Sequence, residues 1–156
     1  ADDVLPIWGL DEDDLLPNTP IQTVSTGTPQ LMIAVRSLDA LRKINLNLAA
    51  YRHFRSQADF FSAHVFCRQG ATAAGQTFAR HIDATEDPFT GSATGGMAAY
   101  LWHYNLIAEP TFVAEQGHWM ARPGQALVEV VGPRDNIETV KVGGSAVTVL
   151  RGELMI

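Results

Sequence analysis

Residues 86–96 read Glu-Asp-Pro-Phe-Thr-Gly-Ser-Ala-Thr-Gly-Gly, and this stretch decides how the rest of the chain is organised. It joins two carboxylates to a proline, which ends any element before it, and to a run of small residues. Directly after it, residues 97–107 are apolar on nearly every side, which predicts a buried helix rather than a surface helix. Thr90 and Ser92 are the candidate N-caps of this helix.

The start of such a helix is suited to binding an anion. Its first backbone N–H groups have no partner within the helix, and the helix dipole places partial positive charge there. Gly91, Gly95 and Gly96 would let a ligand or a neighbouring backbone approach closely. The alternative is a tight turn that feeds a core helix, with glycines that serve packing alone. The motif by itself favours neither interpretation.

Composition excludes several classes of protein. The chain has 156 residues, 46% of them hydrophobic and 18% charged, which is typical of one globular domain. Its net charge of −6 comes largely from six acidic residues within the first fourteen, and no Lys or Arg precedes Arg36. The sequence has no basic patch, so a nucleic-acid partner is not expected. The acidic start is interpreted as the solvated face of a helix.

Cysteine and histidine usage also limits the chemistry. Cys67 is the only cysteine, so an internal disulfide is impossible, and its strand-like surroundings indicate a small buried hydrophobic residue. The five histidines show no metal-ligand spacing, and no dinucleotide or P-loop fingerprint occurs, so we expect neither metal nor cofactor. Without a signal peptide or an apolar run that could span a membrane, we expect a cytoplasmic protein without a membrane partner.

The remaining sequence predicts mostly strands. Residues 1–20 form a linker and lead-in of short helical turns, and a helix capped by Ser37 runs from there to residue 56. Many strands and one helix that is apolar on all sides predict an α+β fold. In it, a curled mixed sheet or barrel wraps around that helix, within a single domain over residues 1–156. The expected strands are 21–24, 31–35, 60–67, 76–82, 111–116, 125–131, 139–142 and 145–150.

Residues 86–96 also carry a resemblance to a known family. The octet from Glu86 to Ala93, together with Gln116-Gly117, Arg122-Pro123-Gly124 and the run from Val142 to Val147, resembles the PhzF-like isomerases of phenazine biosynthesis. The resemblance runs from about Ile21 to the C-terminus. It implies the diaminopimelate-epimerase-like fold, in which two similar halves each wrap strands around a central helix and the active site lies in the cleft between them.

The resemblance covers only the C-terminal half of the family. The N-terminal half, which carries a catalytic glutamate and a Gly-His pair, has no counterpart in this sequence. The chain is therefore expected to be a fragment, one piece of a nicked protein or one subunit of a split enzyme. Its expected partners are a polypeptide equivalent to the N-terminal half, or a second copy of itself, and a small carboxylate substrate.

Roles for individual residues follow from the resemblance. It implies that Asp87 is the catalytic carboxylate, which holds an amine or hydroxyl group of the substrate and relays a proton. Ser92 would line the same pocket as a second catalytic residue, and the amides of Gly91 and Ser92 would bind the substrate carboxylate. Thr90 belongs to this substrate-binding group, and His81, close to Asp87 in sequence, is a candidate to line the cleft.

Three neighbours of Asp87 qualify this assignment. Glu86 is part of the motif, but its expected role is structural. Related racemases carry a cysteine where Thr90 stands, and a threonine cannot replace a thiolate, so a two-thiol mechanism is not expected. Phe89 is bulkier than the residue often found at its position.

The sequence therefore predicts a cofactor-independent isomerase that acts on a small carboxylate by general acid–base proton transfer. Two alternatives remain open. One is an epimerase or dehydratase on the same scaffold, and the other is a non-catalytic interaction module that keeps the fold.

Overall fold

The computed structural model describes residues 3–155 and contains one mixed sheet. Residues 1 and 2 of the predicted lead-in, and Ile156, lie outside the described residues. The strands run in the spatial order β1-β2-β3-β4-β6-β7-β8, and the short β5 pairs with β4. Their bounds are β1 (Gln22–Ser25), β2 (Pro29–Val35), β3 (Ser62–Cys67), β4 (Thr77–Ile82), β5 (Glu86–Asp87), β6 (Thr111–Gln116), β7 (Gly124–Val131) and β8 (Thr139–Gly143). The helices are α1 (Leu38–Lys43), α2 (Leu48–Arg55) and α3 (Gly91–His103), with 3₁₀ turns η1 (Leu5–Trp8), η2 (Glu12–Asp14) and η3 (His118–Met120).

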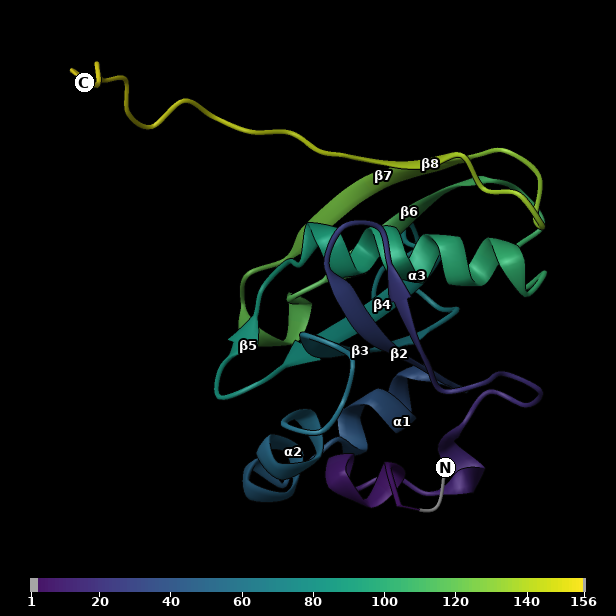
Figure 1. Ribbon diagram of the computed structural model, residues 1–156. Helices are drawn as coiled ribbons and strands as arrows, with labels where there is room; N and C mark the ends of the chain where they lie inside the picture. The colour runs from purple at the N-terminus through teal and green to yellow at the C-terminus, as the bar shows by residue number, and fades with distance from the viewer. Residues whose placement is uncertain (1–2, 156) are drawn as a thin grey trace.

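The sheet curls around α3, as the sequence predicts (Figure 1). Strands from both ends of the sheet, β1 and β2 on one side and β7 and β8 on the other, pack against this one helix. The pairs β2–β3 and β4–β6 are parallel and the others are antiparallel, so the sheet is mixed. Met97, Ala98 and Leu101 of α3 are almost fully buried against the inner face, as expected for a helix that is apolar on nearly all sides.

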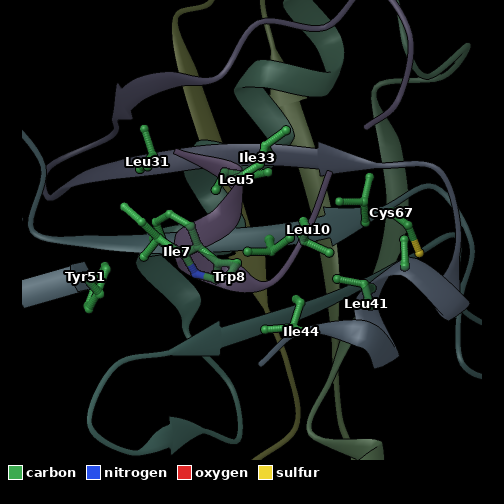
Figure 2. Packing of buried hydrophobic residues seen from close by; sticks show 14 of the residues in the cluster. Leu5, Ile7, Trp8, Leu10, Leu31, Ile33, Leu41, Ile44, Tyr51 and Cys67 are labelled. Carbon is green, nitrogen blue, oxygen red and sulfur yellow. The ribbon is translucent and has the colours of Figure 1, made fainter. Parts of the chain in front are cut away.

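A second core lies on the outer face of the sheet, under α1, α2 and the lead-in (Figures 1 and 2). The lead-in consists of short helical turns, as predicted. Its Leu5 and Trp8 are each 1% exposed and pack in the same cluster as Ile33 and Tyr51. The ring of Trp8 meets that of Tyr51 edge-on, with centroids 5.5 Å apart. The apolar side chains between Val4 and Leu10 are therefore an integral part of this core.

The prediction of one continuous helix over residues 37–56 is wrong. The chain leaves helical geometry after α1 and starts again at α2, and both asparagines of the break take part. The backbone N–H groups of Asn45 and Asn47 donate to the lead-in carbonyls of Trp8 and Ile7, at 3.0 and 2.8 Å. The Asn47 side chain then caps α2. Tertiary hydrogen bonds to the lead-in have replaced helical ones, which the apolar spacing alone cannot reveal.

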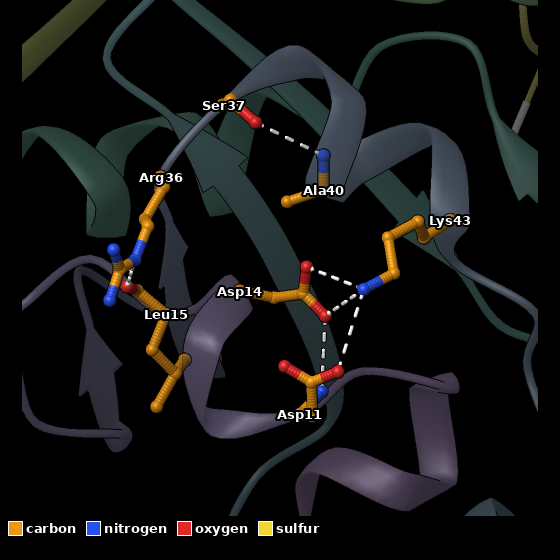
Figure 3. Close-up of polar contacts among 7 residues, drawn as sticks. All are labelled: Asp11, Asp14, Leu15, Arg36, Ser37, Ala40 and Lys43. Carbon is orange, nitrogen blue, oxygen red and sulfur yellow. Dashed lines mark hydrogen bonds and ion pairs between the residues drawn. The ribbon is translucent and has the colours of Figure 1, made fainter.

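The acidic start is only partly solvated. Asp14 is buried, and both of its carboxylate oxygens accept hydrogen bonds from the Lys43 ammonium, at 2.7 and 2.8 Å (Figure 3). Asp11 lies beside them, with 3.5 Å from its Oδ2 to Lys43 Nζ. Burial alone would raise the pKa of Asp14, but Lys43 and the Asp11 amide hold that pKa below its ordinary value. This acidic residue thus fastens the lead-in to α1, which begins at the predicted Ser37 cap.

The central helix ends earlier than predicted, at His103 rather than near residue 107. Asn105 adopts a left-handed conformation with φ of 57°. The amide of Leu106 then donates to the carbonyl of Leu101, and that of Asn105 to the carbonyl of Trp102. This is the Schellman arrangement, which ends a helix at an asparagine or glycine.

The predicted strand over residues 145–150 is also absent. The chain after β8 is an extended, exposed arm that leaves the body of the domain (Figure 1). A strand needs a neighbour that accepts and donates its backbone hydrogen bonds. No neighbour for this arm exists within residues 3–155.

Candidate active site

The β4–β5 hairpin and the start of α3 bring the predicted site residues together. β5 has only two residues, which pair in antiparallel register with the end of β4: Glu86 faces Ile82, and Asp87 faces His81. The Arg80 guanidinium holds Glu86 through two hydrogen bonds of 2.9 and 2.8 Å. This bidentate pair occupies the Glu86 carboxylate and leaves Asp87 as the other acid of β5.

Asp87 is half-buried, and its carboxylate is fixed by the turn that follows. The Thr90 hydroxyl donates to Asp87 Oδ2 at 2.7 Å, whereas Oδ1 receives only a long contact of 3.4 Å from the Phe89 amide. Thr90 occupies the N-cap position of α3, as predicted, but its hydroxyl does not cap the helix. One carboxylate oxygen is therefore held firmly and the other is left available.

Gln116, at the end of β6, holds the same turn through hydrogen bonds to its backbone. Its side chain is buried, donates to the backbone carbonyl of Asp87 at 2.7 Å and accepts from the amide of Thr90 at 3.2 Å. The chain turns directly afterwards at Gly117, where φ is 81° and a Cβ atom would collide with the carbonyl of Pro88. The sequence indicated Gln116 only as part of the Gln116-Gly117 motif. A polar residue that ends an apolar strand just before a glycine was the available signal.

The first turn of α3 is open. Gly91 and Ser92 are exposed, and the first intrahelical hydrogen bond runs from the Thr94 amide to the Thr90 carbonyl. The amides of Gly91, Ser92 and Ala93 therefore precede the hydrogen-bonded part of the helix and can receive an anion. A Cβ atom at Gly91 would meet nothing within 4 Å.

The two later glycines of the motif serve packing. A Cβ atom at Gly95 would lie 3.0 Å from Thr26 Oγ1, and one at Gly96 would lie 2.6 Å from the terminal methyl of Met32. The packing interpretation thus holds for Gly95 and Gly96, whereas the space around Gly91 is open. Gly91 leaves room at the helix end, and Gly95 and Gly96 let the curled sheet approach α3.

A groove of about 620 Å³ adjoins this helix end. Its lining includes Phe89, Gly91, Gly124, Val142, Gly144 and Ser145. The Phe89 ring fits over Gly124, where a Cβ atom would lie 2.6 Å from the ring. The groove is thus a glycine-lined space beside the open amides.

His81 lies next to Asp87 but points into the protein. It is 7% exposed, its Nε2 is 2.8 Å from Ser62 Oγ, and its Nδ1 is 3.2 Å from His64 Nδ1. Burial lowers the pKa of His81, and the Asp87 and Asp83 carboxylates partly oppose that effect. The structure therefore brings His81 to the site with both ring nitrogens already engaged.

Other reactive groups lie elsewhere or are inert. Cys67 is buried, and burial raises the pKa of its thiol to about 11, so the predicted packing role is confirmed. Within residues 3–155, no three His, Cys, Asp or Glu side chains gather in a way that could hold a metal ion. In the same range, none of the helices has the length and apolar character needed to cross a membrane.

Comparisons of sequence identify the relatives of this chain. The phenazine biosynthesis-like protein family matches residues 2–152. An uncharacterised isomerase of Clostridium acetobutylicum is 33% identical over an alignment of 161 positions. The alignment covers 98% of this chain and 53% of that protein. The trans-2,3-dihydro-3-hydroxyanthranilate isomerase of Pseudomonas fluorescens is 26% identical over 139 residues, covering 88% of this chain and 48% of that protein.

Comparison of structures confirms the fold. A PhzF-family phenazine biosynthesis protein of Bacillus anthracis superposes with a TM-score of 0.73 at 24% identity, over 90% of this chain and 49% of that one. The fold class predicted from sequence, α+β with a curled mixed sheet, is therefore confirmed. In each comparison the chain spans about half the length of the protein it matches.

Proposed function

We propose, from the premise that this chain belongs to the phenazine biosynthesis-like protein family, that it forms the C-terminal half of a cofactor-independent isomerase. The substrate is a small carboxylate, and the reaction moves a proton by general acid–base catalysis. One observation carries the proposal. The Asp87 carboxylate is fixed by Thr90 through one oxygen, directly beside the open amide end of α3.

This arrangement gives the two ends of a substrate different partners. The substrate carboxylate binds the amides of Gly91 and Ser92, where unpaired N–H groups and the helix dipole favour negative charge. Asp87 then lies one turn away and uses Oδ1 to hold an amine or hydroxyl group, or to take up and return a proton. Thr90 orients the acid, and the Ser92 hydroxyl lines the pocket from the same turn. A positioned acid–base group of this kind contributes about 10²–10⁴ in rate.

The chemistry needs a second acid–base group on the opposite side of the substrate. Within residues 3–155, Glu86 is engaged by Arg80 and His81 points inward, so neither provides it. The relatives are about twice as long as this chain. We therefore place the second group on a complementary half, which closes the groove beside α3.

The test is exchange of a substrate proton with solvent. The chain is mixed with the non-matching half of the Clostridium acetobutylicum relative in heavy water. The mixture then receives a panel of small carboxylates that includes trans-2,3-dihydro-3-hydroxyanthranilate. We expect deuterium incorporation with both halves present, little with either alone, and a large loss with Asp87→Asn. Exchange that survives Asp87→Asn would remove Asp87 from the mechanism and with it the proposed function.

The same experiment separates the alternative reactions. Epimerisation would give exchange at a stereocentre with inversion, and dehydration would release water. A bound complex without any exchange on the whole panel would favour the non-catalytic module. A two-thiol racemase is not proposed, because Thr90 stands at the cysteine position and Cys67 is buried.

A further inference from the structure

A chain of buried polar side chains crosses three strands directly behind Asp87. It starts at Gln30 on β2, continues through Ser62 on β3 to His81 on β4, and returns to His64 on β3. All four side chains are at least nine-tenths buried. His81 faces Asp87 across the β4–β5 ladder, and residues directly opposite in an antiparallel pair have Cβ atoms about 4.5–5.5 Å apart.

The hydrogen bonds of this chain have one direction. The Ser62 hydroxyl donates its only proton to Gln30 Oε1 at 2.6 Å, so towards His81 it can act only as an acceptor. His81 Nε2 must then carry a proton and donate it to Ser62 at 2.8 Å. In a neutral imidazole the other nitrogen is an acceptor.

The same logic fixes the second histidine. His81 Nδ1 accepts, so His64 Nδ1 must be the donor across their 3.2 Å separation. The neutral His64 ring is left with an unprotonated Nε2. That atom is buried and finds no hydrogen-bond partner among residues 3–155. The row of hydrogen-bonded side chains from Gln30 to His64 is therefore neutral and ends in one free acceptor, His64 Nε2.

We propose that this chain is a one-proton relay behind the active site, in which His81 is a positioning residue for the Asp87 carboxylate. The inference rests on the proposed function of Asp87. A proton that a hydronium ion of the solvent transfers to His64 Nε2, leaving water, lets the Nδ1 proton of His64 pass to Nδ1 of His81. His64 is then neutral again, with its proton on Nε2, and His81 is an imidazolium beside Asp87. No other bond changes, and one proton has been gained.

The surroundings place the charge on His81 rather than on His64. His64 is fully buried and lies against Phe66, with ring centroids 6.2 Å apart. Burial therefore holds its pKa well below the ordinary value. His81 faces two carboxylates, Asp87 from β5 and Asp83 from the β4–β5 turn, and the latter is paired with Arg55 of α2. An ionised Asp87 thus favours a proton on the ring directly behind it.

Nitrogen NMR of the histidine rings tests the proposal on the chain alone. In the wild type we expect His81 as the Nε2–H tautomer and His64 as the Nδ1–H tautomer near neutral pH. Ser62→Ala should abolish the strong preference of His81 for one tautomer. The opposite tautomers in the wild type would reverse the direction of the hydrogen bonds and remove the free acceptor at His64 Nε2. That result would overturn the relay.

Coupling to Asp87 is tested in the same spectra. Asp87→Asn should move the His81 pKa downward, whereas Glu129→Gln, a carboxylate on the outer face of β7, should leave it unchanged. A His81 pKa that is equal in the wild type and in Asp87→Asn would refute the link to the site. Neither measurement requires turnover, so failure of the relay and failure of the isomerase proposal are separate outcomes.

Discussion

At the scale of single residues, Asp87 is the group on which catalysis should depend most. We expect Asp87→Asn to lower the rate of the assembled enzyme by about 10²–10⁴, the usual value of a positioned acid–base group. Stability should change by about 1 kcal/mol or less, because the asparagine oxygen can still accept from Thr90 and the side chain is only half-buried. The rate of deuterium exchange measures the expected loss of activity, and urea unfolding measures the expected change in stability.

The anion-binding role of the helix end is tested by a pair of neighbours. Gly91→Val should fold, because a Cβ atom there meets open space, but its side chain should obstruct an anion at the α3 amides. Ser92→Ala keeps every backbone donor. We therefore expect carboxylate affinity to fall at least about tenfold in Gly91→Val and less in Ser92→Ala, as measured by calorimetric titration of the assembled enzyme. The reverse order would assign the anion to the Ser92 hydroxyl.

Sequence anticipated where these residues gather, but not how they are held. The motif placed Asp87, Thr90, Gly91 and Ser92 at the start of a helix, and the structure brings them to one turn. It did not show that the Thr90 hydroxyl serves Asp87 instead of the helix. That bond lies in a turn that is also held by Gln116, which is 26 residues from Thr90 in the chain. Side chains that meet only through tertiary structure leave no local pattern.

At the scale of elements, the loop before β4 is anchored by one buried acid. Glu115 on β6 accepts from the hydroxyl and amide of Thr72 and from Gln125 Nε2. Burial alone would raise the pKa of Glu115, but these hydrogen bonds hold it below its ordinary value of 4.5. The folded pKa is depressed, so this stabilisation is complete above 4.5 and disappears as the pH falls through the folded pKa.

Unfolding free energies measured in urea between pH 7 and pH 3 should show this effect. We expect the wild type to lose more stability over that range than Glu115→Gln, which cannot make the ionised contacts at any pH. A residual slope should remain in the variant, because the pKa of Asp14 is lowered by Lys43 in the same sense. Glu129→Gln removes an exposed ion pair and should keep the wild-type slope. Parallel curves for the wild type and Glu115→Gln would contradict the anchoring role.

Helices and strands were predicted correctly where a local apolar pattern specifies them. The predictions failed where hydrogen bonds to backbone far away in the sequence determine whether an element forms. Seven strands and the central helix were visible in the sequence because alternation and apolar runs specify them directly. The break between α1 and α2 was not visible, because the lead-in carbonyls of Ile7 and Trp8 take the amides that would have continued the helix. The arm after β8 has a strand's pattern but no neighbour to pair with among the described residues.

At the scale of the whole molecule, that arm is the most exposed apolar part of the described chain. Val147, Val149, Leu150, Leu154 and Met155 are 85–94% exposed, far above the core residues. The root of the arm, Gly144 and Ser145, lines the groove beside the candidate active site. A partner that binds the root of the arm would therefore lie next to this groove and to Gly91 at the start of α3.

We predict that residues 145–155 are the segment through which the complementary half associates. An extended peptide adds to an open sheet edge through backbone hydrogen bonds, and its alternate side chains fill pockets. In a strand, Val147 and Val149 share one face and Thr148 lies on the other. Deletion of residues 145–155 should leave the melting temperature of the chain nearly unchanged, because these residues are exposed, and should abolish association.

Sedimentation of the chain mixed with the complementary half measures this directly. We expect a heterodimer for the wild type, a loss of affinity of at least about tenfold for Val147→Asp, and a smaller loss for Thr148→Asp, which carries the same charge on the opposite face. A self-associated dimer that ignores the added half would assign the arm to a second copy of this chain. Full affinity after deletion of the arm would show that the halves meet elsewhere. The groove beside α3 would then have to close without the segment that borders it.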